Sequence, residues 1–499
     1  MKVTAFVVTV LAGLCTFAAD GIEARIERVK SVKDGIVTSL EVTFNTNVQV
    51  DFSLSPEKGS DIKCRAELPP PEKWNGRMWG QGNSGRAGSV RSLRFLVSEG
   101  SAAVTTDLGT SSVVTKGAPA TDNQWPAAVR RDFHWRATHL MTVYGKRIVE
   151  AFYGRPPRKS YFAGGSTGGR QAMSEAIRYP DDYDGLLVNL PDNNAAVSEI
   201  AAWHLWRQTH DAEGRSLFTT SEMRVVADAA VEYRAATDPA PYAGKFLADA
   251  RFSEAEIDGF LALAAKKCPS FATGDRIPRL KALFMPLVHD GRCYFNGYAP
   301  GTYLGKNMEM YGLVSLRHFM AERNLPSARW KDIGWAEIDM YLKERAPEFN
   351  ACSPDLDAFR ARGGKIIMAT GWEDQTVPPA PIVDYYERVC ERDGGIEKTK
   401  EYFRLFCVPG CAHGGGKGRA MQGSPASSAD ARRLLVAWHE KGEAPEALNA
   451  IWKNRRLDMP IAVYPGLYVR DASGKWQVKQ TKRGVARIDE VSLVTKKGM

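Results

Sequence analysis

The chain has 499 residues, 44% of them hydrophobic and 10% aromatic, and its formal net charge is +9. This composition is typical of a globular protein with a sizeable core and excludes a chain that is disordered over most of its length. Basic and acidic residues are interleaved without a basic helix or an RNA-binding motif, so the positive charge predicts no nucleic-acid partner.

The first residues predict a secretory signal peptide over residues 1–18. Lys2 gives a positive start, residues 3–17 are mostly apolar, and small residues suitable for cleavage follow. This apolar run is shorter than the about 20 residues that a membrane-spanning helix needs, and no later segment is apolar enough to cross a membrane. A lipid anchor on Cys15 is the alternative. We therefore expect a secreted or periplasmic protein without a membrane span.

Seven cysteines follow the predicted signal peptide, an odd number that leaves at least one thiol unpaired. Export permits disulfides, but their pairing does not follow from the sequence. No two of the seven are spaced as C-x-x-C, so we expect no structural zinc site.

The first third of the chain predicts strands and helices in alternation. Residues 22–55 alternate apolar and polar positions, which predicts strands, and the Pro- and Gly-rich stretch ELPPPEKWNGRMWGQGNSGRAGSV predicts a loop. The segments that follow are, in order, strand AAVTTDLGT, helix RRDFHWRATHLMTVYGKRIVEAFYG ending at Gly154, strand KSYFAGG, helix GGRQAMSEAIRYP and strand YDGLLVNLP. This alternation over residues 95–190 predicts a parallel sheet with crossover helices.

The pattern changes over residues 195–345, which are aromatic-rich and predicted to be helical, without clear strands. The sheet pattern then returns with strand GGKIIMATG, helix PIVDYYERVCERDG, strand YFRLFCVPG and helix DARRLLVAWHEKG. We therefore predict an α/β core in two parts, residues 19–195 and 346–499, interrupted by a large helical lid insertion at residues 196–345.

The stretch Gly164-Gly165-Ser166-Thr167-Gly168 fits the motif G-x-S-x-G between a predicted strand and a predicted helix. Small residues let the chain turn sharply there, so that the Ser166 hydroxyl is exposed as a nucleophile. The helix start would aim the Thr167 amide at a developing oxyanion. The alternative is a glycine-rich turn with an idle serine, which the strand and helix context disfavours. A phosphate-binding loop is excluded, because G-x-x-x-x-G-K-[ST] is missing.

A serine nucleophile needs a base and an orienting carboxylate, which follow it along the chain in the order Asp or Glu, then His. Asp374 follows a predicted strand, with Glu373 as the alternative acid. His413 follows the next strand. The other histidine after Asp374 is His439, which lies in a helical pattern and is interpreted as a packing or surface residue.

These motifs resemble those of the tannase and feruloyl esterase family of α/β-hydrolases, which also contains the hydroxyethyl-terephthalate hydrolases. The likeness covers nearly all of the chain after the signal peptide, and includes LPPPEKWNGRMWGQGNSGRAG, SYFAGGSTGGRQAMSEAIRYPDDYDGLL, GGKIIMATGWEDQTVPP and FRLFCVPGCAHGGG. The resemblance implies an α/β-hydrolase fold with Ser166 as nucleophile, Asp374 as orienting acid and His413 as base. It also implies that Gly82 and Asn83 lie beside the oxyanion, together with Thr167.

The chain departs from the family pattern at two glycines. Members of the family usually carry a cysteine before the nucleophile and another after the histidine, joined by a disulfide, where this chain has Gly165 and Gly414. The family's acidic calcium loop is also missing from the lid segment, so we expect no metal and no cofactor. His139 and Asp107 match the family pattern and are interpreted as structural residues.

The resemblance implies a secreted serine carboxylic ester hydrolase. Its expected partner is a small-molecule aromatic ester, such as a galloyl or hydroxycinnamoyl ester, cleaved through an acyl-enzyme on Ser166. The alternatives are an acyltransferase that uses an alcohol other than water, and a non-catalytic binding protein on the same fold.

Overall fold

The structure is a computed structural model of the whole chain. It describes residues 21–114, 125–237, 245–310, 333–414, 425–450, 452–453, 459–481 and 484–490. The predicted signal peptide, residues 1–18, lies outside the described residues. Among the residues described, no helix combines the length and the apolar character that crossing a membrane requires.

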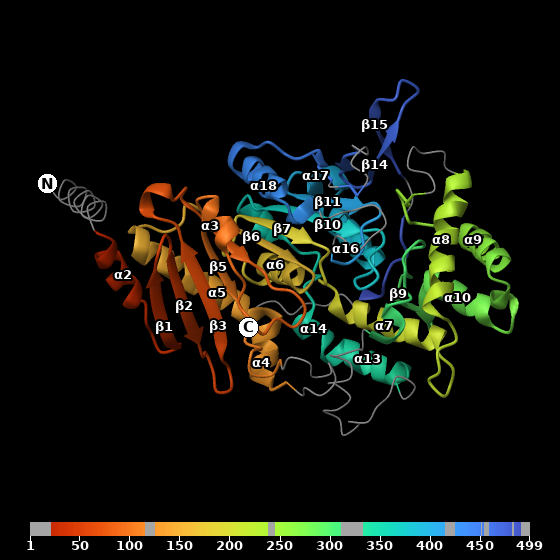
Figure 1. Cartoon of the computed structure of the whole chain (residues 1–499), viewed down its shortest axis with the longest axis horizontal. Helices are drawn as coiled ribbons and strands as arrows, with labels where there is room; N and C mark the ends of the chain where they lie inside the picture. The colour runs from red at the N-terminus through yellow and green to blue at the C-terminus, as the bar shows by residue number, and fades with distance from the viewer. Residues whose placement is uncertain are drawn as a thin grey trace. The chain divides into compact units, whose positions relative to one another are not determined.

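The chain forms two compact units (Figure 1). The first consists of Met1–Ala118, Trp125–Ala163 and Tyr179–Asp184, and the second of Pro119–Gln124, Gly164–Arg178 and Gly185–Met499. The chain passes from the first to the second within strand β6 (Lys159–Gly165), between Ala163 and Gly164.

The first unit contains a mixed sheet in the order β1-β2-β3-β5-β4-β6. Its strands are β1 (Val37–Phe44), β2 (Val48–Leu54), β3 (Ile62–Leu68), β4 (Arg77–Gln81) and β5 (Ala102–Thr106), with the first residues of β6. β1, β2, β3 and β5 pair antiparallel, whereas β4 runs parallel to β5 and β6. In β2 every second side chain is buried, as the apolar alternation of VQVDFSL requires of a strand with one covered face.

Helices of the first unit pack on this sheet. The predicted helix ending at Gly154 is confirmed as α4 (Ala127–Arg131), a π-helical turn at Asp132–Arg136 and α5 (Ala137–Tyr153). Gly154 adopts φ 76°, the left-handed conformation that ends many helices. α5 packs against β5, and α3 (Arg94–Ser98) connects β4 to β5.

Two predictions for this unit are wrong. Residues at the start of the predicted strand region form helix α2 (Ile22–Lys30), which buries Arg25 and Val29 at helical i, i+4 spacing. The predicted loop contains strand β4. The reason is tertiary: a Cβ atom at Gly80 would lie 2.3 Å from the Tyr183 hydroxyl, so this glycine is needed for close packing within a strand rather than for a turn.

The second unit contains the parallel strands β7 (Gly185–Asn189), β10 (Lys365–Gly371) and β11 (Phe403–Val408), in that order. They are accompanied by α6 (Thr167–Arg178), α16 (Pro379–Asp393) and α18 (Ala429–Lys441), of which α6 and α18 pack against β7. All six elements confirm the predicted strands and helices. The parallel strands are almost fully buried, as their apolar runs predict.

Between β7 and β10, the described residues from Ala195 to Glu344 form a helical region. Its longer helices are α7 (Ala195–Thr209), α8 (Thr220–Thr237), α9 (Glu254–Lys267), α10 (Arg276–Phe284) and α13 (Trp335–Glu344), which share one hydrophobic core. The prediction of a region without strands is wrong, because β8 (Leu287–His289) and β9 (Arg292–Phe295) form a hairpin. Asp290 and Gly291 both have positive φ, as a two-residue Asp-Gly hairpin turn requires.

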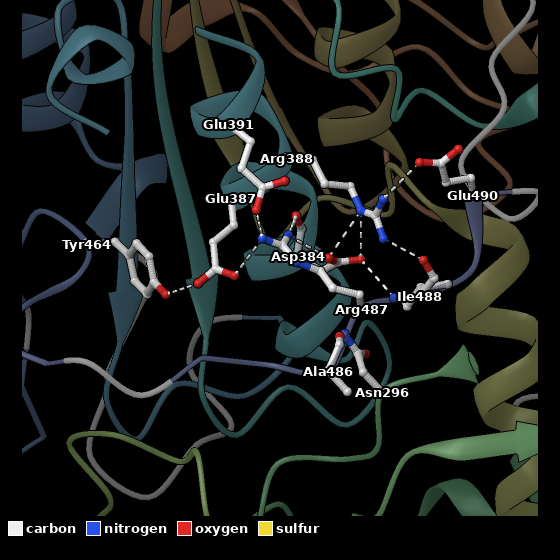
Figure 2. Close-up of polar contacts among 10 residues, drawn as sticks. All are labelled: Asn296, Asp384, Glu387, Arg388, Glu391, Tyr464, Ala486, Arg487, Ile488 and Glu490. Atoms are coloured by element: carbon white, nitrogen blue, oxygen red, sulfur yellow. Dashed lines mark hydrogen bonds and ion pairs between the residues drawn. The ribbon is translucent and has the colours of Figure 1, made fainter. Parts of the chain in front are cut away.

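The end of the described chain joins this helical region to helix α16. After the hairpin of β14 (Gly466–Arg470) and β15 (Trp476–Gln480), residues 484–490, here called the C-terminal strap, lie against α16 (Figure 2). Asp384 of α16 accepts hydrogen bonds from Arg487 and from the Ile488 amide, and the Asp489 amide donates to Cys293 of β9. Ile488 is 1% exposed and belongs to the core of the helical region.

Candidate active site

Ser166 occupies a sharp turn between β6 and α6. Its φ of 58° is uncommon for a residue other than glycine. A Cβ atom at Gly164 would lie 2.2 Å from the carbonyl oxygen of Gly168, so the turn admits no side chain there. The Ser166 amide donates to Asn189 of β7 (2.9 Å), and its carbonyl accepts from Gly169 (2.9 Å). These two hydrogen bonds hold the backbone of Ser166 in a strained conformation.

Three side chains of the second unit form a hydrogen-bonded chain at this turn. His413 Nε2 lies 3.0 Å from Ser166 Oγ, and His413 Nδ1 lies 2.8 Å from Asp374 Oδ2. Asp374 is fully buried, and its Oδ1 accepts from the amides of Thr376 and Val377. A carboxylate only accepts hydrogen bonds, so Nδ1 carries the imidazole proton and Nε2 is the basic nitrogen that faces the serine hydroxyl.

The predicted acid Asp374 and its alternative Glu373 have different partners in the structure. Asp374, rather than its neighbour Glu373, lies at hydrogen-bond distance from His413. The Glu373 amide donates to the carbonyl of Cys411, which ties the loop after β10 to the segment that carries the histidine. The other candidate histidine, His439, is part of α18.

The predicted oxyanion groups belong to different units. Thr167 is the first residue of α6, where the amide of a helix start has no intrahelical acceptor and the helix dipole favours negative charge. In the first unit, the Gly82 amide donates to Ala163 (2.8 Å). The Asn83 side chain donates to Ser89 and accepts from Arg91, which fixes its loop. The Thr167 amide therefore directly follows the nucleophile. The Gly82 amide, in contrast, already donates its hydrogen bond to Ala163.

Two residues near the triad were missed by the sequence analysis. The amide of Asp192 donates to the Ser166 carbonyl (3.1 Å), and the amide of His413 donates to Gln375 Oε1 (3.2 Å). Burial raises the pKa of Asp192, although the charges of Arg170 and His413 oppose this shift. A signal for Asp192 was present, because it follows strand β7, and the carboxyl ends of parallel strands meet at one edge of a sheet.

Among the described residues no disulfide supports the triad, since the seven cysteines from Cys64 to Cys411 are all free thiols. Gly165 has an ordinary φ, and a Cβ atom there would lie 3.3 Å from Asn189. Gly414 has φ 82° and open space where a Cβ atom would point. The loops are tied by backbone hydrogen bonds instead, such as that from Trp372 to Val408 (3.0 Å).

The two other family-pattern residues hold loops of the first unit. Asp107 Oδ1 accepts from the amides of Gly109 (2.7 Å) and Lys63 (2.9 Å), which closes the turn after β5. His139 Nδ1 lies 2.7 Å from Asp182. Both side chains are thus held by hydrogen bonds within the first unit.

Comparisons with known proteins show which family this chain resembles. A family model described as "Tannase and feruloyl esterase" matches residues 47–240 and 308–473. A probable feruloyl esterase B-2 from Aspergillus flavus is 28% identical over 445 residues, which are 81% of this chain and 80% of that protein. Feruloyl esterase B from Aspergillus niger is 27% identical over 421 residues, which are 80% of this chain and 78% of that protein.

Solved structures show the same fold. Feruloyl esterase B from Aspergillus oryzae is similar with a TM-score of 0.76 and 19% identity, covering 92% of this chain and 100% of that chain. Tannin acyl hydrolase from Aspergillus niger is similar with a TM-score of 0.71 and 18% identity, covering 92% of this chain and 95% of that chain. The predicted α/β fold class is thereby confirmed.

Proposed function

The chain belongs to the tannase and feruloyl esterase family of carboxylic ester hydrolases, and from this premise we propose that it cleaves esters of aromatic acids through an acyl-enzyme on Ser166. The observation that carries the proposal is the hydrogen-bonded chain from Ser166 Oγ to His413 (3.0 Å) and on to Asp374 (2.8 Å). Ser166 lies on a strained turn at the start of a helix, which is the setting in which a serine hydroxyl acts as a nucleophile.

In the proposed reaction, His413 Nε2 takes the proton of Ser166 Oγ as the oxygen attacks the ester carbonyl carbon. Asp374 stabilises the imidazolium that forms, and the Thr167 amide donates to the oxyanion. The tetrahedral intermediate collapses, the C–O bond to the alcohol breaks, and His413 returns the proton to the departing alcohol oxygen. Water then repeats the sequence on the acyl-enzyme, which releases the acid and restores Ser166.

The proposed substrate class comes from the relatives. Their names specify feruloyl esters and tannin as substrates, and both contain aromatic acyl groups. The predicted signal peptide supports a secreted or periplasmic location, which N-terminal sequencing of the mature protein tests: we expect it to begin near residue 19. A mature protein that still begins at residue 1 would overturn the proposal of export.

A labelling and turnover experiment tests the mechanism. We expect a fluorophosphonate to modify Ser166, and methyl ferulate or methyl gallate to be hydrolysed faster than an aliphatic methyl ester. The variant Ser166→Ala should fold, resist labelling and lose on the order of 10⁴-fold or more in kcat. A folded Ser166→Ala protein with near-normal turnover contradicts the mechanism. A wild-type protein that is neither labelled nor active would favour the non-catalytic alternative.

If methanol or another alcohol intercepts the acyl group faster than water does, the transferase alternative is favoured instead. Product analysis distinguishes the two reactions, because hydrolysis yields the free acid and transfer yields a new ester. We expect the free acid as the main product.

A further inference from the structure

The loop that carries the catalytic acid, residues 372–377, is held on two sides. Here called the acid loop, it follows β10, and its amides at Trp372 and Glu373 donate to Val408 and to Cys411. These two bonds fix the loop to the end of β11 and to the segment that follows it. On another side the acid loop contacts the helical region, and this contact has no part in the mechanism proposed above.

Gln375 contacts both the triad histidine and the helical region. Its side-chain Oε1 accepts from the backbone amide of His413 (3.2 Å), and its backbone carbonyl accepts from Asn307 Nδ2 (2.9 Å). The orientation of both amide side chains follows from their partners, because a backbone N–H requires an acceptor and a carbonyl requires a donor. One residue thus lies between the triad histidine and the helical region.

Asn307 is a firmly placed anchor. It is 7% exposed, begins the short helix α11 (Asn307–Met310), and its own amide donates to Leu304 (2.9 Å). Leu304 and Met308 on either side belong to the hydrophobic core of the helical region. Nearby Thr302, which is 2% exposed, donates a longer bond to the carbonyl of Trp372 (3.4 Å). The packing of the helical region therefore fixes the position of the Asn307 amide.

The position of the histidine backbone governs both triad contacts. The imidazole must meet Ser166 at one nitrogen and Asp374 at the other, so a displaced peptide at His413 lengthens at least one of these bonds. Misplacing a catalytic group by about 1 Å can cost on the order of 10²-fold in rate. Among the described residues no disulfide joins this segment to the nucleophile turn, and the hydrogen bond from the His413 amide to Gln375 Oε1 is one contact that holds the peptide in place.

We propose that Gln375 is a positioning residue of the triad, which couples the His413 peptide through Asn307 to the core of the helical region. The inference rests on the proposed function of Ser166 and His413. Its consequence is that the packing of the helical region sets the reactivity of the serine, in addition to whatever that region contributes to substrate binding.

Paired substitutions test this coupling. Gln375→Met keeps the length of the side chain and removes the acceptor, whereas Gln375→Glu keeps an acceptor for the His413 amide. Asn307→Leu removes the donor to Gln375. The matched control is Asn296→Leu, because Asn296 is 8% exposed and its Nδ2 donates over 3.1 Å to Ala486 of the C-terminal strap instead of to the acid loop.

We expect Gln375→Met and Asn307→Leu to lower kcat about tenfold, with KM changed less than about twofold, because the defect lies in triad geometry rather than in binding. The rate of fluorophosphonate labelling at Ser166 should fall in parallel. Gln375→Glu should retain most of the wild-type kcat. Asn296→Leu should keep the wild-type kcat although it loses a comparable hydrogen bond.

Two outcomes would overturn the inference while leaving the proposed function intact. One is a folded Gln375→Met or Asn307→Leu protein with wild-type kcat and labelling rate. The other is an Asn296→Leu protein that loses as much kcat as Asn307→Leu at equal Tm, which would indicate general destabilisation. A wild-type protein that is not labelled at Ser166 would overturn the proposed function itself.

Discussion

Asp374 and Glu373 are adjacent carboxylates, and only their geometry separates their roles. Asp374 contacts His413 Nδ1 at 2.8 Å and is itself held by two backbone amides. We expect Asp374→Asn to lower kcat by on the order of 10⁴-fold, because the amide favours the wrong histidine tautomer. Glu373→Gln should cost far less. Steady-state kinetics on the preferred methyl ester measures both, and the reverse ranking would move the acid by one residue.

Asp192 gives a prediction on pH and stability. Burial raises its pKa against the opposing charge of Arg170 and the hydrogen bond from Ser198, so its ionisation costs more in the folded than in the unfolded state. Near pH 3 both states hold the proton and the cost is absent. This free-energy cost of ionisation appears as the pH rises through the folded-state pKa of Asp192. We expect Asp192→Asn to be more stable than wild type at pH 7 and to lose this advantage towards pH 4.

Urea denaturation at several pH values measures this difference. Asp211 is a control of opposite sign, because hydrogen bonds from the Arg215 amide and side chain lower its pKa. Asp211→Asn should therefore lose stability relative to wild type as the pH rises from 3 to 7. An Asp192→Asn protein that follows the same trend as Asp211→Asn would show that the buried carboxylate is stabilised in its ionised form.

At the scale of residues, the sequence predicted those groups whose chemistry follows from local pattern. Ser166 lies in a turn motif between a strand and a helix, and Asp374 and His413 follow strands in a fixed chain order. Gln375 has no such pattern, and Asp192, although it follows strand β7, has no place in that chain order. Their importance depends on which backbone groups the folded chain brings to them, and periodicity and spacing do not contain that information.

Strand β4 illustrates the same limit for whole elements. Its sequence was predicted as a loop because of its glycines, yet Gly80 lies in the strand with the Tyr183 hydroxyl and the Phe162 ring against it. We expect Gly80→Ala to lower the free energy of unfolding by about 1–3 kcal/mol through overpacking. Gly35→Ala is the control, because a Cβ atom there meets nothing within 4 Å. Equal effects of the two substitutions on urea unfolding would contradict the packing explanation.

The turns on either side of the triad lead to a prediction about redox conditions. Because the triad is held without a disulfide, activity should be unchanged in mild reductant. Cysteines at both Gly165 and Gly414 would restore the bridge of the family pattern, which can stabilise by about 2–4 kcal/mol. At φ 82°, however, Gly414→Cys costs about 1–3 kcal/mol in backbone strain, so we expect little net gain.

Activity with and without reductant, and the Tm of the oxidised and reduced double variant, measure these effects. A wild-type protein that stays folded but loses activity in reductant would show that another cysteine pair supports the triad. A large rise in Tm on oxidation would show that the backbone at residue 414 relaxes out of its left-handed conformation.

The elements that the sequence predicted correctly are long or fully buried. The parallel strands β7, β10 and β11 are short apolar runs bounded by turn residues, and α16 and α18 have clear helical spacing. Among the elements it missed, the two strands of the β8–β9 hairpin are only three and four residues long. Such short strands depend on contacts with the rest of the fold more than on their own propensity.

At the scale of the whole molecule, the α/β class was predictable from alternating elements, but the C-terminal strap was not. Ile488 is 1% exposed within the core of the helical region, whereas Val478 on β15 is 48% exposed. We expect Ile488→Ala to lower the free energy of unfolding by about 2–5 kcal/mol, because it leaves a cavity. Val478→Ala should change it by less than about 0.5 kcal/mol. Similar effects of both substitutions would place the strap outside the core.

The position of the strap near the end of the sequence also constrains when this protein can fold. A ribosome makes the helical region long before it makes Ile488 and the arginine that reaches Asp384 of α16. Domains generally fold as units during synthesis, starting from the N-terminus, and the first unit can follow that order. The second cannot complete its hydrophobic core until Ile488 has been synthesised. A chain that ends before Arg487 would therefore expose apolar surface of the helical core, which is the kind of product that chaperones and proteases remove.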